Sequence, residues 1–272
     1  MYKVKIERIF DLFITVTRNP GGRITTVKYI LALLTILVLP QIVYGNSAYI
    51  NEIPDFTQTD IRGTNSGHGQ QYCAPVAVSN SLMWLSKKSS GQLDLIKKLA
   101  SKKYMNTSLI NGTGTTGVLN GVDKIAVELF GGYSKLEYQG WRKHPKIYSM
   151  GVKIPKISWM EKGISRESAV WLNVGWYRFN KAENEYRRIG GHWVTLVGVE
   201  NNILIIHDPA LMAGNTFSNE FVQISKIYDG TLSGDKAGLP TPAKGYFILG
   251  KGMHIRPKAD VAILDGAIVF RL

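Results

Sequence analysis

The sequence predicts an α+β fold in which a helical first half packs against an antiparallel sheet formed by the second half. Apolar residues at helical spacing occur up to about residue 130. Beyond Gly131 the apolar runs are instead rich in Val, Ile and aromatic residues and are separated by turn residues, which is typical of strands. This segregation favours an antiparallel sheet, because a doubly wound parallel sheet needs helices and strands to alternate.

Three helices are expected in the first half. From Cys73 to about Tyr104 the apolar residues follow helical spacing, with one break at Ser89-Ser90-Gly91. A loop rich in Gly and Thr, Asn111 to Gly117, leads into the third helix. The apolar residues of that helix are Val118, Val122, Ile125 and Leu129. The loop lacks the Lys-Ser/Thr ending of a phosphate-binding loop, so we interpret it as a turn.

Five strands are expected in the second half, each an apolar run bounded by turn residues. They are Ala169–Phe179, His192–Val199, Ile203–Ile206, Tyr246–Leu249 and Ala262–Phe270. The second and third of these are separated by a short turn, which predicts a hairpin.

Residues 1–45 are interpreted as a targeting segment that is not part of the fold. Basic residues precede an apolar run from Tyr29 to Leu39, and Val43-Tyr44-Gly45 then fits a signal-peptidase site; a cut after Ala48 is an alternative. We therefore expect an exported protein, periplasmic or extracellular, whose residues 46–272 form a single domain. An uncleaved anchor that associates with the membrane through residues 29–44 is the other interpretation, although the run is shorter than the roughly 20 residues that span a bilayer.

The chain is basic, with 33 Lys+Arg against 20 Asp+Glu and a formal net charge of +13. The basic residues are scattered, and no helix-turn-helix, zinc-finger or RNA-binding motif accompanies them, so we expect no nucleic-acid partner. A solvated surface, biased toward an anionic envelope or acidic substrates, is the preferred interpretation. The single Cys excludes an internal disulfide framework and a Cys-rich zinc site. We expect no metal, no cofactor and a monomer.

That single Cys lies at a position suited to a catalytic nucleophile, the start of an expected helix. Cys73, in Gln70-Gln71-Tyr72-Cys73-Ala74-Pro75, immediately precedes a helical pattern, and Pro75 fits a first helical turn. A helix N-terminus favours the thiolate form, which is the nucleophile. A buried, inert Cys is the alternative.

Two downstream residues are suitable partners for the thiol. His192 follows two glycines at the start of an expected strand and is placed to act as a base. Asp208 ends the next expected strand, and a hairpin would bring its carboxylate to the imidazole. His207 points to the opposite face of that strand, so we interpret it as structural and expect no metal site with His192 and Asp208.

Three motifs in this order resemble the papain-like cysteine peptidases: Gln-x-Cys-x-Pro opening a helix, Gly-His-Trp-Val-x-Leu-Val-Gly on a strand, and Ile-Ile-His-Asp-Pro on the next. The nearest likeness is to the bacteriocin leader-processing (double-glycine) peptidase branch and its free-standing bacterial relatives, over roughly residues 60–210. The resemblance implies a papain-like fold. In it, a helical half bearing Cys73 packs on a sheet bearing His192 and Asp208, and the active site lies in the groove between them.

The sequence departs from this family at the oxyanion hole. The family carries an oxyanion-stabilising Gln about six residues before the nucleophile, and that position is Gly67 here. Gln71, or less readily Gln70, would reach the site if the loop is remodelled. The alternative is that the Cys73 backbone N–H works with His68.

The resemblance implies an exported cysteine peptidase or amide-bond hydrolase that acts on a peptide or protein through a thioester acyl-enzyme. Transamidation by the same Cys-His-Asp triad is a variant of this chemistry. Trp193 and Trp176 are expected to line the substrate groove, although aromatic residues on strands are more often core. The alternative function, which the Gly67 departure favours, is a catalytically silent binding module with a papain-like fold.

Overall fold

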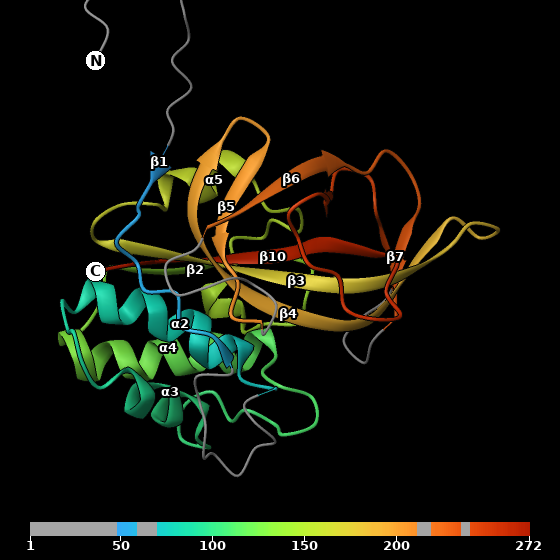
Figure 1. Ribbon diagram of the computed structural model, residues 1–272. Coiled ribbons are helices and arrows are strands. Elements are labelled where there is room, and N and C mark those ends of the chain that lie inside the picture. Colours follow the sequence, from blue (N-terminus) through green and yellow to red (C-terminus); the bar gives the residue numbers. More distant parts are fainter. Residues whose placement is uncertain (1–47, 59–69, 211–218, 235–239) are drawn as a thin grey trace, which may run out of the picture. The chain divides into compact units, whose positions relative to one another are not determined.

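The computed structural model describes residues 48–58, 70–210, 219–234 and 240–272 (Figure 1). The targeting segment predicted for residues 1–45 lies outside the described residues, as do Gly67 and His68. Within the described part of the chain, no helix has both the length and the apolar character needed to cross a membrane.

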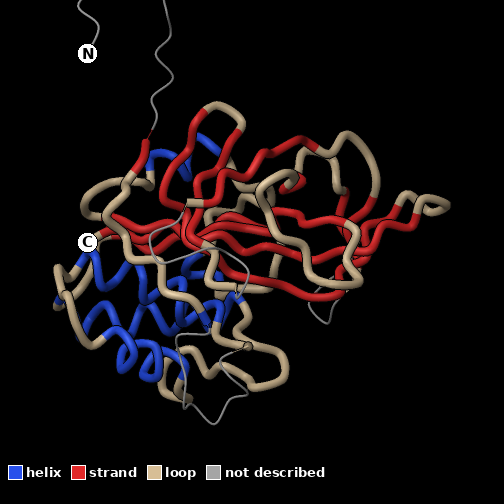
Figure 2. The backbone as a smooth tube through the Cα atoms, in the orientation of Figure 1, coloured by secondary structure: helices blue, strands red, loops and turns tan. Residues whose placement is uncertain are grey.

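The three expected helices are confirmed as α2 (Cys73–Leu85), α3 (Gln92–Ala100) and α4 (Thr115–Phe130). They lie together on one side of the strands (Figure 2). Nearly all of α2 is buried, because it packs on the sheet on one side and on α3 and α4 on the other. Its Ala and Ser residues are small enough to let these elements approach closely. A short helix that the sequence did not indicate, α5 (Ile157–Lys162), lies apart from these three (Figure 1).

Six strands pair in a closed ring, so the sheet forms a barrel. They are β3 (Ser168–Asn180), β4 (Glu185–Glu200), β5 (Ile203–His207), β6 (Glu220–Lys226), β9 (Phe247–Leu249) and β10 (Val261–Arg271). Every pairing around this ring is antiparallel. The expected class of helices plus an antiparallel sheet is therefore confirmed, and the more specific papain-like assignment remains a proposal.

Shorter strands extend this ring at several points. They are β1 (Ala48–Tyr49), β2 (Lys135–Gly140), β7 (Thr231–Ser233) and β8 (Thr241–Pro242), and a 3-10 turn, η3 (Lys146–Tyr148), follows β2. Only β7 breaks the antiparallel pattern, since it runs parallel to the start of β4. None was expected, because their segments are too short or too polar to show a clear periodicity.

The strand that carries His192 begins earlier than the sequence suggested. Starting it at His192 was wrong, because β4 begins at Glu185 and pairs over its whole first half with β3. The segment from Glu185 to Gly191 has little apolar character, so a pattern-based reading does not show it. His192 consequently lies inside a long strand, where neighbouring strands fix its backbone.

Alternation along β3 divides the apolar core into two parts. Val170, Leu172, Val174 and Trp176 belong to the barrel interior. Trp171 instead belongs to the layer between the sheet and the helices. Two buried hydrogen bonds cross that layer: Thr195 Oγ1 donates to the Ala77 carbonyl at 2.8 Å, and Trp171 Nε1 donates to Ser81 Oγ at 3.1 Å. These bonds fix α2, and with it Cys73, against β4 and β3.

A buried asparagine holds the segment before α2 in place. Asn80, in α2, accepts hydrogen bonds through Oδ1 from the Phe56 backbone N–H at 3.1 Å and from Gln92 Nε2 at 2.6 Å. Its Nδ2 also donates to the Phe56 carbonyl at 3.4 Å. An asparagine inside a helix normally competes with the helical backbone. Here its side chain instead ties the stretch Ile53–Gln58 to the helix that carries Cys73.

We predict that Asn80→Ala lowers the free energy of unfolding by about 2–3 kcal/mol, because it leaves buried donors on Phe56 and Gln92 without their acceptor. Urea denaturation measures this change. Asn120→Ala, in the half-buried face of α4, is the matched control and should change stability by only a few tenths of a kcal/mol. Equal effects of the two substitutions would contradict the anchoring role of Asn80.

Candidate active site

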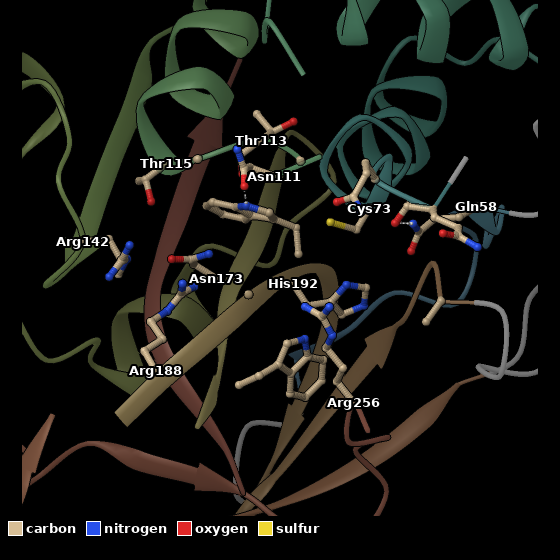
Figure 3. Close-up of a pocket in the computed structure, with 18 of the residues that line it drawn as sticks. Gln58, Cys73, Asn111, Thr113, Thr115, Arg142, Asn173, Arg188, His192 and Arg256 are labelled. Atoms are coloured by element: carbon tan, nitrogen blue, oxygen red, sulfur yellow. Dashed lines mark hydrogen bonds between the residues drawn. The ribbon is translucent and has the colours of Figure 1, made fainter. Parts of the chain in front are cut away.

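Cys73 is the first residue of α2 and is partly exposed. No side chain caps this end of the helix. The first backbone N–H groups of a helix lack intrahelical acceptors and carry a partial positive charge, so this end of α2 presents hydrogen-bond donors. Figure 3 shows the Cys73 sulfur directed into a cleft between the helices and the sheet. The expected position of Cys73 at a helix start is thus confirmed.

The β4–β5 hairpin brings His192 and Asp208 into contact. Antiparallel pairing of Thr195 with His207 and of Leu196 with Ile206 aligns the two strands. His192 Nε2 lies 2.5 Å from Asp208 Oδ1, and both side chains are buried. Because Nε2 binds the Asp208 carboxylate, Nδ1 is the ring nitrogen of His192 that is left to interact with the Cys73 thiol.

Electrostatics favour a positively charged His192. Burial is the largest single influence and lowers the pKa of His192. The charge of Asp208 and hydrogen bonds to Asp208 and Cys73 raise it, and together they outweigh burial and bring the pKa to about 10. The raised pKa favours the imidazolium form of His192. Burial also acts to raise the pKa of Asp208, but His192 and His254 hold it well below its usual range.

Asp208 contacts several hydrogen-bond donors, and one of them, His254, was not expected from the sequence. Its Oδ1 also accepts the Ala210 backbone N–H at 2.9 Å, and its Oδ2 lies 3.0 Å from His254 Nδ1. His254 comes from the connection between β9 and β10 and belongs to no motif. Trp176 stacks on His192 with ring centroids 5.8 Å apart and meets His254 edge-on at 5.5 Å. The rings of Trp176 and His254 therefore restrict rotation of the His192 imidazole.

A second residue that sequence reasoning missed is Gln58. It is buried, and its backbone N–H donates to the Pro209 carbonyl at 2.7 Å, next to Asp208. Its Nε2 donates to the Gln70 carbonyl at 2.8 Å. Figure 3 places Gln58 on the same side of the cleft as Cys73. Gln58 lies 15 residues before Cys73, well beyond the spacing of about six residues that the family resemblance implies.

The two glutamines singled out from the sequence also border the cleft. Gln70 is exposed, and its backbone carbonyl is the acceptor for Gln58. Gln71 is half-buried, and its Oε1 lies near Gly112, 3.4 Å from where a Cβ on that glycine would be. Their suggested role at an oxyanion remains a prediction.

Trp193 and Trp176 line the cleft but are only 2% and 3% exposed, and their role in a substrate groove remains a prediction. Trp193 Nε1 donates to the Thr113 carbonyl at 3.0 Å, so this indole also fixes the loop before α4. Both indole rings are therefore buried in the wall of the cleft, and little of either ring is accessible to a ligand. His207 lies elsewhere: its Nδ1 donates to the Pro54 carbonyl at 3.3 Å, and burial lowers its pKa. This agrees with a structural role.

The cleft has a volume of about 920 Å³ and is open to solvent. Its described lining contains cationic and neutral polar side chains but no Asp or Glu. Within the described ranges, no group of three or more His, Cys, Asp and Glu is arranged to hold a metal ion. The site thus presents a thiol, a histidine whose pKa is raised and hydrogen-bond donors, which is a set suited to acyl transfer.

Comparison with known proteins adds little to this geometry. No family model matches the chain, and no curated protein matches it. A solved structure from Bacillus anthracis, described provisionally as a C39-like peptidase, is 10% identical with a TM-score of 0.40. The match covers 83% of this chain and 98% of that one. At this TM-score the likeness assigns neither fold nor activity, so the functional argument rests on the residues of the site.

Glu220 makes the stability of this region depend on pH. Its Oε2 accepts the Asp208 backbone N–H at 3.2 Å, and burial and the charge of Asp208 raise its pKa from 4.5 to about 8. The folded state therefore binds one more proton than the unfolded state between these two pH values. Consequently this group's contribution to the free energy of unfolding falls as the pH rises from about 4.5 to 8.

We predict that Glu220→Gln removes this loss, because the variant has no charge to bury. The difference in free energy of unfolding, variant minus wild type, should increase from pH 4.5 to 8 and then level off. Chemical denaturation at several pH values measures it. Parallel stability curves for the two proteins would show that Glu220 ionises as freely in the folded state as in the unfolded state.

Proposed function

We propose that this protein is a cysteine peptidase or related amide-bond hydrolase that uses Cys73, His192 and Asp208 as a catalytic triad. The observation that carries the proposal is the buried 2.5 Å contact between His192 and Asp208, with Cys73 facing the same cleft from a helix N-terminus. A buried carboxylate that fixes an imidazole beside a nucleophile is the arrangement that acyl transfer requires. A purely structural role for His192 would not explain why a partly exposed thiol lies beside it.

The proposed reaction begins with the Cys73 thiolate and the His192 imidazolium. The sulfur attacks the carbonyl carbon of an amide, and the C–S bond forms while the carbonyl electrons move to oxygen. The His192 Nδ1 proton passes to the amide nitrogen, the C–N bond breaks and the amine leaves. Water then loses a proton to His192 and attacks the thioester, which releases the acid and restores the thiolate. Asp208 holds the ring in place through Nε2 throughout.

The developing oxyanion needs hydrogen-bond donors, and we propose two groups that border this part of the cleft. The Cys73 backbone N–H lies at the end of α2, where it has no intrahelical acceptor. Gln58 borders the cleft beside Cys73, and its amide nitrogen carries two N–H groups. We propose Gln58 as the side-chain donor in preference to Gln71, because hydrogen bonds to Gln70 and Pro209 fix its position.

Export remains part of the proposal. It rests on the sequence of residues 1–45 alone.

The hydrolytic activity is tested by incubating the full-length protein with a diverse peptide library and identifying the products by mass spectrometry. We expect cleavage that disappears in Cys73→Ala and falls by at least a thousandfold in His192→Ala. Asn111→Ala, at the exposed rim of the cleft, is the matched control and should retain activity. Cleavage that persists in Cys73→Ala would refute the mechanism. Peptide binding with no cleavage by the wild type would favour a silent binding module.

The oxyanion assignment gives a separate prediction. Gln58→Ala should lower kcat about 10²–10³-fold with little change in KM, because the amide acts on the transition state more than on the bound substrate. Gln71→Ala is the matched control and should change kcat by less than about threefold. The reverse pattern, with Gln71→Ala impaired and Gln58→Ala active, would return the role to Gln71.

A further inference from the structure

The two glycines before His192 make room for arginine side chains. A Cβ on Gly191 would clash with Nη2 of Arg188, and a Cβ on Gly190 would lie 2.8 Å from Nη1 of Arg256. The Arg188 guanidinium therefore lies over Gly191, one residue before His192, and the Arg256 guanidinium lies over Gly190, two residues before His192. Any larger residue at these positions would displace them.

Arg188 is held in place by a buried carboxylate. Its Nε donates to Asp265 Oδ2 at 2.7 Å, and its side chain is 9% exposed. Asp265 is completely buried in β10 and also accepts hydrogen bonds from Trp141 Nε1, at 2.9 Å, and from the Tyr177 hydroxyl. Such fixed neighbours orient the guanidinium, so its Nη2 side is presented over Gly191 to the cleft.

Asn173 adds a polar atom that lacks a partner. It lies opposite Trp193 in the β3–β4 pairing and is 4% exposed. Its Oδ1 is buried and has no hydrogen-bond partner within the described part of the chain. Figure 3 shows Asn173 next to Arg188 on the side of the cleft away from Gln58. An unpaired buried acceptor is unfavourable, and an N–H group of a ligand would satisfy it.

The charge around Asn173 is strongly positive. Arg142, Lys143, Arg188 and Arg256 line the cleft, whereas none of its described lining residues is acidic. A cleft lined by one sign of charge concentrates ligands of the opposite sign.

We propose that this end of the cleft, formed by Asn173, Arg142 and Arg188, is a subsite for a substrate carboxylate close to the amide bond that Cys73 attacks. The arginines bind the carboxylate, for which guanidinium geometry is well suited. Asn173 Oδ1 accepts an N–H of the substrate backbone. The substrates are therefore peptides with an acidic side chain, or a free terminal carboxylate, beside the scissile bond. This inference rests on the proposed peptidase function.

A pair of alkylating agents of similar size tests the subsite without a known substrate. Iodoacetamide is neutral and reports the reactivity of Cys73, whereas iodoacetate carries the carboxylate that the subsite would attract. We expect the ratio of the iodoacetate rate to the iodoacetamide rate to fall at least fivefold in Arg188→Gln, with the iodoacetamide rate unchanged within about twofold. The matched control is Arg178→Gln on β3, whose arginine binds the Lys258 carbonyl and borders a different cavity. It should leave the ratio unchanged.

Arg188→Gln leaves the buried Asp265 without its cation and could impair folding. Asn173→Asp is the second variant, because it places a negative charge inside the subsite and should lower the ratio by a similar factor. An unchanged ratio in every folded variant would overturn the subsite. Slow reaction of the wild type with iodoacetamide would instead count against the triad, so the two failures are distinguishable.

Protection experiments identify the source of the carboxylate. N-acetyl-glutamic acid amide carries an acidic side chain, N-acetyl-glutamine carries a free terminal carboxylate, and N-acetyl-glutamine amide carries neither. We expect one of the first two to slow alkylation of Cys73 by iodoacetamide more than the third does, and this protection to be lost in Arg188→Gln. Equal effects of all three compounds, or none, would contradict a carboxylate subsite.

Discussion

The contact between His192 and Asp208 is the interaction on which the site depends. Burial alone would leave the imidazole neutral, and the carboxylate at 2.5 Å reverses this and raises its pKa to about 10. The same carboxylate is bound by His254 and by the Ala210 backbone N–H, so it cannot turn away. The raised pKa favours a positively charged imidazole that faces the same cleft as Cys73.

The fold supplies this geometry through contacts between distant parts of the chain. The hairpin of β4 and β5 aligns the histidine with the aspartate, and the hydrogen bond from Thr195 to the Ala77 carbonyl holds α2 on that hairpin. Asn80 then binds the stretch that ends at Gln58 to the same helix. Cys73, His192 and Gln58 are therefore positioned by contacts with one helix and one hairpin.

Local patterns in the sequence predicted the elements with strong periodicity and the Cys73, His192 and Asp208 set, because each of these residues lies at the end of, or within, an apolar run. Gln58 and His254 could not be found this way, since only tertiary contacts bring them to Asp208 and its neighbours. The arginines of the cleft appeared scattered because their elements are far apart along the chain. The first half of β4 is stabilised by pairing with its neighbours and therefore shows little apolar pattern.

The most direct test of the account is the rate of Cys73 alkylation by iodoacetamide between pH 4 and pH 10, compared with His192→Ala. An isolated thiol gains reactivity only as the pH approaches about 8.5. Pairing with the His192 imidazolium predicts fast alkylation that persists below about pH 6 in the wild type and is lost in the variant. Identical profiles that both rise only above about pH 8 would show that Cys73 and His192 are not coupled, and would contradict the triad.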